Sequence, residues 1–518
     1  MFVTADANHI VVPWRQDLAS VMPHARALDY QGQRMLLVPN QHAEAKVARN
    51  LGIPVPAPIL TRYDWCNQKP WHTQKITAAL LTESASAYVL NEFGTGKTRA
   101  VIWAADYLRR HAGAKRVLIA APLSTLTPVW EAELFRLLPL ARVRVLHGDR
   151  RTRLERLEDD ADFYIINHHG LPLMRDALIK KGFDIFVIDE QATFRNKSTD
   201  LWKAANAVIR SGAKPPQFVW GLTGSPVPKA ATDAWGQIRL LTPDRTSTSL
   251  NRFKDMTMRQ ITGFKWVNRP QAMDIVYEQM QPSVRFALTD VIELPPTIYR
   301  DHQVQLEPET RKAYKLLFDK ASMMTQRGEV VTAVNEGVLQ SKLLQVSLGY
   351  VYSDKGTKIK LSNDNRIDML SELVASTSRK VIVFVPFIHA LEGVAAALQK
   401  ETSVAVIHGG SPVGFRNKTF RAFQEEPEPR VIVAHPGCMS HGLNLTAANL
   451  IVWFGPTNNY ETYEQANARI VRPGQLSKTI IAHLIGTPVE RLAYKRLRER
   501  ATFQGMLLEL FHQQVLEY

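Results

Sequence analysis

The stretch AYVLNEFGTGKTRAVIWAADYLRR, residues 87–110, decides how this chain folds. It opens with a short apolar run of the kind that forms a buried strand, and residues 99–110 have a helical pattern. Between them lies the loop Asn91–Thr98, which contains two glycines and two threonines. Small residues between a strand and a helix let backbone N–H groups approach a bound phosphate. The stretch therefore predicts a phosphate-binding loop on an α/β sheet.

The side chains of this loop have the chemistry that a nucleotide phosphate requires. Lys97 supplies a cation for the phosphate oxygens, and the Thr98 hydroxyl can hold Mg²⁺. The strict pattern begins with glycine, whereas this loop begins with Asn91. The predicted nucleotide contacts are Gly94, Thr95, Gly96, Lys97 and Thr98.

Short β-branched runs that end in a polar or glycine-rich turn recur in two blocks. The first block contains AYVL (87–90), RVLIAAP (116–122), RVRVLHG (142–148), FYIINH (163–168), DIFVIDE (184–190) and FVWGLTG (218–224). The second contains KVIVFVPF (380–387), SVAVIHGG (403–410), RVIVAHP (430–436), LIVWFGP (450–456) and TIIAHLIG (479–486). Near-continuous apolar strands that alternate with helices indicate buried parallel sheets. Two such blocks predict an α/β fold with two parallel-sheet lobes.

The pattern divides the chain into five regions. We expect a small N-terminal accessory domain over residues 1–62, which end in the proline-rich PVPAPIL, and a first lobe over 63–245. Residues 246–300 are predicted to be an irregular insertion or linker between the lobes. The second lobe is expected over 301–490, and residues 491–518 are predicted to form a C-terminal helical brace.

Composition narrows the class of protein. A chain of 518 residues is too long to fold around one hydrophobic core, so several domains are expected. The formal charge of +15 suggests a polyanionic partner. Two cysteines, Cys66 and Cys438, exclude a disulfide framework or zinc cluster and fit a reducing compartment. The N-terminus lacks a secretory pattern, and the apolar runs are too short to span a bilayer. We therefore expect a soluble, cytoplasmic protein without a membrane partner.

An acidic pair, Asp189-Glu190, closes the apolar strand of residues 183–188. Alone, such a pair would be interpreted as a solvated turn. At the carboxyl end of a buried strand, in the same lobe as Lys97, it predicts a different role. Asp189 would hold Mg²⁺ and Glu190 would polarise the attacking water.

Together these residues resemble superfamily 2 helicases and translocases, most closely the Swi/Snf-like branch, including versions encoded by tailed phages. The resemblance covers about residues 63–490, with its motifs in the expected order. Phe93–Thr98 matches motif I, Asp189–Ala192 stands for the DEAH-like motif II, and Leu222–Pro226 resembles motif III. The resemblance implies two RecA-like lobes.

The resemblance also implies the ligands, ATP and Mg²⁺. Gln74 looks like the adenine-reading glutamine upstream of the phosphate loop. Thr98 and Asp189 would be the Mg²⁺ ligands. Gln191 and Ala192 depart from the DEAH sequence, which leaves the metal and water roles unchanged.

The second lobe carries two further motif-like segments. Gly442–Thr446 is similar to motif V, and Gln465–Gln475 is similar to motif VI, with Gln465 at the nucleotide. Arg469 and Arg472 are three residues apart and are predicted to share one helical face. Either can serve as an arginine finger that reaches the γ-phosphate from the second lobe.

Contacts with a nucleic-acid backbone call for hydroxyls, amides and cationic side chains. The candidate nucleic-acid contacts are Ser124, Thr125, His408, Gly409, Arg416, His441 and Asn444.

Other residues invite more than one interpretation. Tyr63, Trp65 and Trp71 can stack on adenine or pack in the core. His168 and His169 lie at a strand end, but no second cluster completes a metal site. We interpret both histidines as structural or backbone-contacting.

These observations predict an ATP hydrolase, a DNA-dependent ATPase or helicase that moves on duplex or branched DNA, with DNA favoured over RNA. Two alternatives stay open: an RNA or DNA unwinding helicase of the same superfamily, and a catalytically idle DNA-clamping subunit. A P-loop kinase or transporter ATPase leaves the second block unexplained. We expect a monomer in the cytoplasm of a bacterium or phage-infected host, with replication, recombination or repair proteins as possible partners.

Overall fold

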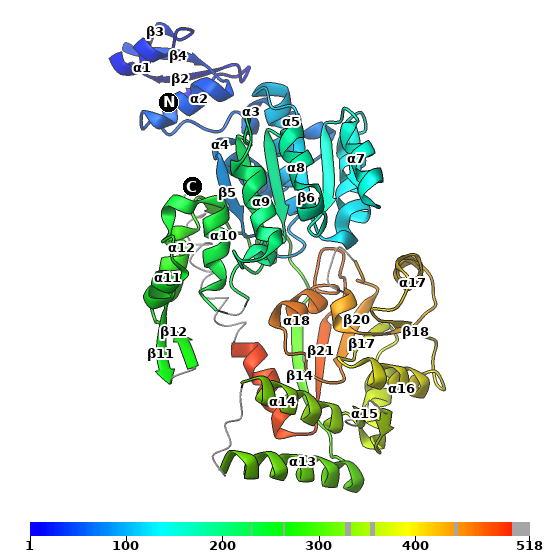
Figure 1. The fold of residues 1–518 in the computed structure, drawn as a ribbon. Coiled ribbons are helices and arrows are strands. Elements are labelled where there is room, and N and C mark those ends of the chain that lie inside the picture. The colour runs from blue at the N-terminus through cyan, green and yellow to red at the C-terminus, as the bar shows by residue number, and fades with distance from the viewer. Residues whose placement is uncertain (229, 263–264, 327–332, 353–357, 440–443, 500–518) are drawn as a thin grey trace. The chain divides into compact units, whose positions relative to one another are not determined.

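The computed structural model describes residues 1–228, 230–262, 265–326, 333–352, 358–439 and 444–499 (Figure 1). The chain forms two compact units, the first of Met1–Val291 and the second beginning at Ile292. Each unit is described separately below.

The N-terminal residues of the first unit form their own small antiparallel sheet (Figure 1). Its strands, in spatial order, are β1 (Phe2–Val3), β2 (His9–Pro13), β4 (Gln33–Pro39) and β3 (Arg26–Tyr30). Two helices, α1 (Gln16–Val21) and α2 (His42–Asn50), bury Leu18 and Ala45 against Ile10 and Leu36 of the sheet. The accessory region therefore has a core of its own, and Arg49 joins it to the following lobe through an ion pair with Glu83.

A seven-stranded sheet forms the centre of the first unit. Its order is β13 (Ser283–Val284), β5 (Ser86–Val89), β10 (Phe218–Leu222), β9 (Ile185–Asp189), β6 (Val117–Ala121), β8 (Phe163–Asn167) and β7 (Val143–Leu146). Every neighbouring pair is parallel. The six strands predicted in the first block are confirmed.

Helices cover this sheet because its strands are apolar on both faces. The helices are α4 (His72–Glu83), α5 (Lys97–His111), α6 (Ala132–Leu137), α7 (Arg150–Glu158), α8 (Gly170–Lys181), α9 (Asp200–Arg210) and α10 (Asp233–Leu241). Ile119 and Val187 face one side, where they pack with residues of α4, α5 and α6 such as Trp103. Their neighbours Leu118 and Ile188 are also fully buried, so both faces are covered.

Residues 246–300, predicted as irregular, contain regular elements instead. These are α11 (Leu250–Thr257), the hairpin of β11 (Met258–Thr262) and β12 (Lys265–Asn268), α12 (Ala272–Gln279) and β13. After α12 the chain returns to the first sheet, where β13 pairs with β5. The segment up to Val291 thus belongs to the first unit.

The second unit contains a six-stranded sheet. Its order is β14 (Thr297–Gln303), β21 (Thr479–Ile485), β20 (Ala448–Trp453), β17 (Lys380–Phe384), β19 (Val431–Ala434) and β18 (Val404–Ile407), all parallel. Figure 1 shows β14, in green, beside β21, in red, so the first and last strands of the unit are neighbours. The five strands predicted in the second block are confirmed, and β14 is an addition.

The helices of this unit are α13 (Pro308–Gln326), α14 (Ala333–Ser347), α15 (Asp364–Ala375), α16 (Ile388–Leu398), α17 (Val413–Glu425), α18 (Tyr460–Asn467) and residues 488–499. A short hairpin, β15 (Tyr350–Tyr352) and β16 (Lys358–Lys360), precedes α15. Val383 packs on the face that holds α15 and α16, and Ile382 packs on the face that holds α17 and α18. The predicted brace is helical to residue 499, and its remainder lies outside the described residues.

These observations establish the α/β architecture with two parallel-sheet lobes. In the described ranges, the helices fall short of the length and apolarity needed to cross a membrane.

Candidate nucleotide site

The phosphate loop and the acidic pair lie at the same edge of the first sheet. Leu222 of β10 is level with Val89 of β5 on one side and with Asp189 of β9 on the other. The carboxyl ends of these three parallel strands therefore end side by side. Motif I follows β5, motif II ends β9, and motif III follows β10.

Two glycines give the phosphate loop its shape. Gly94 has φ 85° and Gly96 has φ 74°, in the left-handed region that favours glycine. Gly96 is also the N-cap of α5, and a Cβ there would lie 2.2 Å from Nε2 of Gln74. Backbone geometry and space both require glycine at residue 96, next to the first turn of the helix.

Gln74 lies beside the loop, where the sequence placed an adenine-reading residue. Its amide Nε2 donates to the Gly96 carbonyl at 3.3 Å, and its Oε1 accepts from the Trp71 backbone N–H at 2.9 Å. The second bond caps α4. Gln74 therefore ties the start of α4 to the phosphate loop, and its contact with adenine stays a prediction.

Lys97 is held inside the loop by backbone carbonyls. Its Nζ donates to the Asn91 oxygen at 2.8 Å and to the Glu92 oxygen at 3.0 Å. Burial lowers the pKa of Lys97, while the carboxylates of Glu190 and Asp189 act to raise it. The cation thus faces both the loop and the acidic pair, as a group that binds phosphate oxygens must.

Asn91 replaces the usual first glycine for a structural reason. Its buried side chain donates to the Thr77 hydroxyl at 3.0 Å and accepts from the Phe286 N–H at 2.9 Å. The first of these bonds reaches α4 and the second reaches the chain that follows β13. The amide therefore anchors the base of the phosphate loop on two sides, which glycine would not do.

Arg285 is a residue that the sequence analysis missed. It forms an ion pair with Glu92 at 2.5 Å and donates to the carbonyls of Leu90 and Phe286. The other Glu92 oxygen accepts from the Leu288 N–H at 2.8 Å. No local pattern marks Arg285, because its partners Leu90 and Glu92 are almost 200 positions earlier in the chain.

Asp189 is half-buried at the end of β9 and has a specific donor. The indole Nε1 of Trp130 donates to its Oδ2 at 2.9 Å. Burial raises the pKa of Asp189, while the Trp130 hydrogen bond and the Lys97 charge lower it. Trp130 belongs to η3 (Leu126–Glu131), which follows η2 (Leu123–Thr125), so the segment after β6 supplies an orienting group for motif II.

Glu190 adopts a strained backbone conformation. Its φ of 51° and ψ of 52° are left-handed, which costs a non-glycine residue about 1–2 kcal/mol. The conformation turns the chain from β9 directly into η4 (Gln191–Phe194). Strained residues cluster at functional sites, where the surrounding structure holds them in place.

Gln191, a departure from the DEAH sequence, fills space beneath the sheet edge. It is fully buried, and its Nε2 donates to the Gln237 carbonyl at 3.3 Å. A Cβ on Gly221 would lie 2.1 Å from its Oε1. Gly221 on β10 therefore makes room for Gln191, and the departure from DEAH is explained by the packing of this side chain against β10 and α10.

Motif III contacts the phosphate loop directly. The Thr223 N–H donates to the Val89 carbonyl at 3.0 Å, which extends the β10–β5 pairing by one residue. A Cβ on Gly224 would meet the Phe93 ring at 3.2 Å. The Phe93 ring in turn lies 5.0 Å from the Lys97 ammonium. A change at the loop can therefore reach motif III through Phe93.

The three aromatic residues before the loop have different roles. Tyr63 and Trp65 are buried in the core of the first unit, whereas Trp71 is 38% exposed.

His168 has a structural role, because its Nε2 lies 2.8 Å from the Asp189 carbonyl oxygen. Burial lowers the pKa of His168 to about 4, so the ring is neutral and Nε2–H is the donor.

In the second unit, the predicted helical face for the two arginines is wrong. Helix α18 ends at Asn467 and is capped by Ala468, so Arg469 and Arg472 lie in the turns that follow. After Asn467 the chain continues in tighter turns, in which the N–H groups of Arg469 and Ile470 donate to the carbonyls three residues earlier, and Gly474 is left-handed, with φ 96°.

The two arginines also have different surroundings. Arg469 is 4% exposed, and its Nε donates to the Gln465 carbonyl at 2.9 Å. Arg472 is partly exposed, and burial lowers its pKa. Gln465 is buried, and its amide lies 3.4 Å from a Glu461 carboxylate oxygen. Arg472 is therefore the more accessible of the two candidates.

Gln475 holds the motif VI turn against motif V. It is buried, and its amide Nε2 donates to the carbonyls of Thr446, Ala448 and Ile470. The turn that carries Arg472 is therefore fixed to the beginning of β20.

The nucleic-acid candidates differ in accessibility. Ser124, Gly409 and Asn444 are exposed, and His408 and Arg416 are half-buried. Thr125 is buried, and its hydroxyl donates to the Pro122 carbonyl at 2.9 Å. This bond uses its proton inside η2 and weakens the case for Thr125. His441 lies outside the described residues.

The described residues contain no group of three or more His, Cys, Asp or Glu that could hold a metal ion. A Mg²⁺ that arrives with a nucleotide needs only one or two protein ligands, because phosphates and waters supply the others. The Thr98 hydroxyl at the start of α5 and the Asp189 carboxylate on β9 provide the oxygen ligands that Mg²⁺ prefers. The site therefore fits a cation shared with the substrate.

A left-handed glycine loop with an internal lysine, facing two carboxylates across parallel strands, defines a P-loop ATPase. Residues 53–349 match the model of the SNF2-related domain, and residues 365–474 match that of the helicase conserved C-terminal domain. The chain belongs to the SNF2-related family of superfamily 2 and is an ATP hydrolase.

Similar proteins include a phage protein and bacterial helicases. Protein p41 of Acyrthosiphon pisum secondary endosymbiont phage 1 is 25% identical over 80% of this chain and 93% of its own length. An uncharacterized ATP-dependent helicase of Mycoplasma pneumoniae is 25% identical over 81% of this chain. The DNA annealing helicase and endonuclease ZRANB3 of Bos taurus is 22% identical over 85% of it. The chain spans about two fifths of each of the last two relatives.

A solved structure, the Sulfolobus solfataricus SWI2/SNF2 ATPase core in complex with dsDNA, is also similar. It is 21% identical, covers 87% of this chain and 96% of its own, and has a TM-score of 0.41.

Proposed function

We propose that this chain couples ATP hydrolysis to movement along duplex or branched DNA. The observation that carries the proposal is the meeting of Lys97 with Asp189 and Glu190 at one sheet edge, in a chain that also has a second parallel-sheet lobe. A P-loop kinase or transporter ATPase would account for Lys97 and the acidic pair but would leave the second parallel-sheet lobe without a role.

In this proposal the first unit binds the triphosphate. Backbone N–H groups at the start of α5 contact the phosphates, and Lys97 exchanges its bonds with the Asn91 and Glu92 carbonyls for phosphate oxygens. Gln74 is close enough to the loop to contact the base. Glu190 orients the attacking water.

Mg²⁺ would be held by Thr98 and Asp189. When bound, it neutralises the charge on the phosphate oxygens. The Trp130 indole fixes the orientation of the Asp189 carboxylate, and His168 fixes its backbone. Both partners preorganise the ligand before the substrate arrives.

Arg472, with Arg469 as its neighbour, would supply positive charge from the second unit. An arginine that reaches the γ-phosphate only when the lobes close links hydrolysis to lobe movement. If both lobes grip the phosphate backbone of DNA, a cycle of closing and opening moves the protein along it. The formal charge of +15 and the exposure of Ser124, Gly409 and Asn444 support such contacts.

The deciding experiment measures ATP hydrolysis without nucleic acid and with single-stranded DNA, duplex DNA, branched DNA and RNA, over a range of salt. We expect a low basal rate that rises most with duplex or branched DNA and falls again at high salt. Lys97→Ala should abolish hydrolysis. Lys46→Ala, which removes an exposed lysine of α2, is the matched control and should keep it. An unchanged rate with all four nucleic acids contradicts the proposal.

A further pair of assays separates translocation from unwinding. A translocase displaces a third strand from a triplex without separating a duplex, whereas an unwinding helicase separates the duplex. The similarity to a phage protein supports work in the cytoplasm of a phage-infected host, beside replication, recombination or repair proteins.

A further inference from the structure

Two neighbouring pockets open in the first unit, away from the nucleotide site. The larger has a volume of about 750 Å³ and the smaller about 380 Å³. Both are lined by Lys115 and Arg116, so they adjoin each other. We call the two together the basic trough.

The basic trough lies at the amino-terminal edge of the seven-stranded sheet. Arg116, Arg142, Asp162 and Asp184, which line it, directly precede β6, β7, β8 and β9. The phosphate loop follows the carboxyl end of β5, and all these strands are parallel. A strand of five residues spans roughly 17 Å, so the trough and the nucleotide site are separate sites at opposite edges.

Cations predominate in both pockets. The larger is lined by the cations Arg109, Arg110, Lys115, Arg116, Arg136 and Arg142 and by four aspartates. The smaller adds Lys180, Lys181 and Lys214, with one carboxylate, Asp184. The trough is therefore a concave surface of net positive charge.

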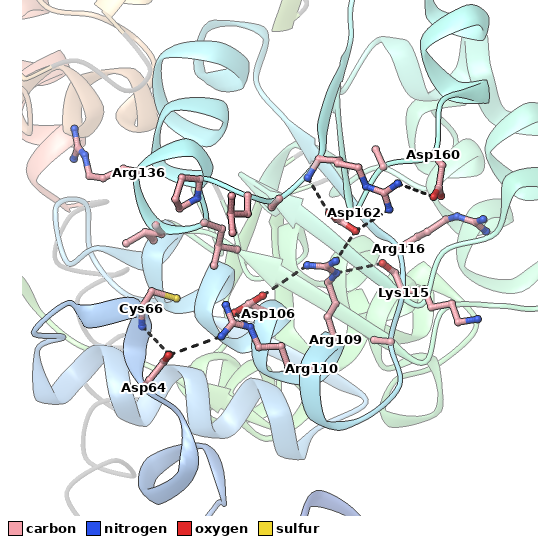
Figure 2. Close-up of a pocket in the computed structure, with 18 of the residues that line it drawn as sticks. Asp64, Cys66, Asp106, Arg109, Arg110, Lys115, Arg116, Arg136, Asp160 and Asp162 are labelled. Carbon is pink, nitrogen blue, oxygen red and sulfur yellow. Dashed lines mark hydrogen bonds and ion pairs between the residues drawn. The ribbon is translucent and has the colours of Figure 1, made fainter.

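Ion pairs hold the arginines of the larger pocket in place (Figure 2). Arg109 pairs with Asp162 at 2.5 Å, and Arg110 pairs with Asp106 at 2.8 Å. Arg142 pairs with Asp160, also at 2.8 Å, and leaves 55% of its side chain exposed. Because a guanidinium has five N–H donors, these pairs orient each arginine and leave donors for a ligand.

The lysines of the trough are more available than the arginines. Lys115 and Lys180 are exposed, and their ammonium groups have no ion pair or hydrogen bond with any residue that the structure describes. Lys214 lies 3.2 Å from Asp184 and is 68% exposed. Lys115 and Lys180 can bind an external anion without breaking a contact, whereas Lys214 would share its charge with the buried Asp184 carboxylate.

The lining also distinguishes between classes of partner. None of the described residues that line either pocket is aromatic. Protein interfaces are rich in aromatic anchors, and single-stranded nucleic acid is usually held by aromatic stacking. A preorganised set of arginines and free lysines without aromatics suits the phosphates of a duplex backbone.

We propose that the basic trough is a second DNA-binding site, which contacts the phosphate backbone of duplex DNA at the sheet edge opposite the nucleotide. The choice of DNA as the polyanion rests on the proposed function. A site that does not take part in the ATP cycle would keep the protein on its track while the lobes release and rebind. It would raise affinity for all sequences alike, because phosphate contacts carry no sequence information.

The test uses the triple variant Lys115→Ala, Lys180→Ala, Lys214→Ala. Binding of a fluorescein-labelled 40-base-pair duplex is measured by anisotropy without nucleotide, between 50 and 200 mM salt. Each lost phosphate contact makes the plot of log K against log salt less steep by about 0.9, so the slope should change by about 2 to 3. The loss should be equal for duplexes of different sequence.

A matched variant, Lys46→Ala, Lys203→Ala, Lys400→Ala, removes the same charge from exposed lysines that line neither pocket. It should keep a steeper slope than the trough variant, and thermal unfolding should show that both variants fold. Equal slopes for the parent and the trough variant overturn the proposal. Absence of duplex binding by the parent at 50 mM salt, or preferential competition by poly-glutamate, also overturns it.

These results are separable from the fate of the proposed function. If ATP hydrolysis rises with DNA but the salt slope of the trough variant is unchanged, the proposed second DNA-binding site is wrong and the proposed ATP-driven movement on DNA stands. If the salt slope changes but DNA does not alter the rate of ATP hydrolysis, the second DNA-binding site stands and the proposed ATP-driven movement is wrong. Lysine acetylation adds a local readout, since duplex should protect Lys115 and Lys180 from the reagent.

Discussion

Arg285 and Glu92 form an ion pair at 2.5 Å, although 193 positions separate them in the sequence. Arg285 is 3% exposed and comes directly after β13, in the segment that leads out of the first unit at Val291. Glu92 is the second residue of the phosphate loop. The loop is thus bonded to the chain that leaves its unit, which offers a path between nucleotide binding and the rest of the molecule.

Arg285→Met should weaken both stability and nucleotide binding. The change leaves the Leu90 carbonyl without its buried donor, which costs about 1–3 kcal/mol of unfolding free energy, whereas the Phe286 carbonyl keeps the Glu92 N–H as a donor. The loop also loses its anchor, so the KM for ATP should rise by about tenfold. Denaturant unfolding followed by tryptophan fluorescence and steady-state hydrolysis measure the two effects.

Arg252→Met is the control, because Arg252 is an exposed arginine of α11. It should change neither quantity. A double-mutant cycle of Arg285→Met with Glu92→Gln should show coupling between the two changes. Additive effects would mean that the ion pair does not act on the loop.

The sequence predicted most of the fold because the buried strands are marked by their composition. Runs such as Ile185–Ile188 are apolar throughout, as strands covered on both faces must be. In the two parallel sheets that the structure describes, two strands lacked this mark. β13 has only two residues, and β14, at the sheet edge, has the polar sequence TIYRDHQ with half-buried and exposed side chains. Both depend on pairing with β5 or β21, which no local pattern reveals.

The residues of the nucleotide site could be predicted because they lie in contiguous sequence motifs. The residues that hold those motifs in place could not be predicted. Gly96, Lys97 and Asp189 belong to contiguous motifs with a local mechanism. Trp130 and Arg285 act on those motifs from distant parts of the chain, so only the folded structure identifies them. The helical face predicted for the motif VI arginines failed because α18 ends at Asn467, and hydrogen bonds to carbonyls three residues earlier turn the chain that follows.

Glu190→Gln should separate hydrolysis from binding. The amide keeps the size of the side chain but cannot act on water as a carboxylate does, so hydrolysis should fall by about 10²–10⁴ while nucleotide affinity stays. Phosphate release and binding of a fluorescent ATP analogue measure the two quantities. A rate within twofold of the parent would remove Glu190 from the mechanism.

Glu190→Gly adds a second readout at the same position. Glycine adopts φ 51° without strain, so the free energy of unfolding should rise by up to about 1 kcal/mol while hydrolysis is lost. A stabilised but inactive variant would indicate that the strain is retained for function. A destabilised Glu190→Gly variant would show instead that the side chain is structural.

His168 should make the first unit sensitive to acid. Its pKa is lowered to about 4 in the folded state, against about 6.5 when unfolded. Between these values the unfolded chain binds the extra proton, so the free energy of unfolding falls as the pH falls from about 6.5 to 4. The full difference corresponds to about 3 kcal/mol. Denaturant unfolding at several pH values measures it.

His168→Gln removes this titration and should flatten the pH dependence in that window. The exposed His24 is the control, and His24→Gln should keep the parent's slope. The comparison is made between variants at each pH, because the carboxyl of Asp189 also titrates, from a raised pKa. Parallel curves for the parent and His168→Gln would contradict the assignment of His168 as a buried neutral ring.

Arg472→Lys should slow hydrolysis more than Arg469→Lys does. Arg469 is nearly buried and donates to the Gln465 carbonyl within its own unit, whereas Arg472 is partly exposed. An arginine finger contributes about 10³–10⁵ to the rate, and lysine cannot reproduce its planar set of donors. The Arg472 variant should therefore keep ATP affinity and stability while its single-turnover rate falls at least a hundredfold. Arg469→Lys should instead lower the unfolding temperature, because its buried hydrogen bond is lost. If Arg472→Lys hydrolyses ATP at the parent's rate, the second unit does not complete the nucleotide site through this residue, and the coupling of hydrolysis to lobe closure needs another donor.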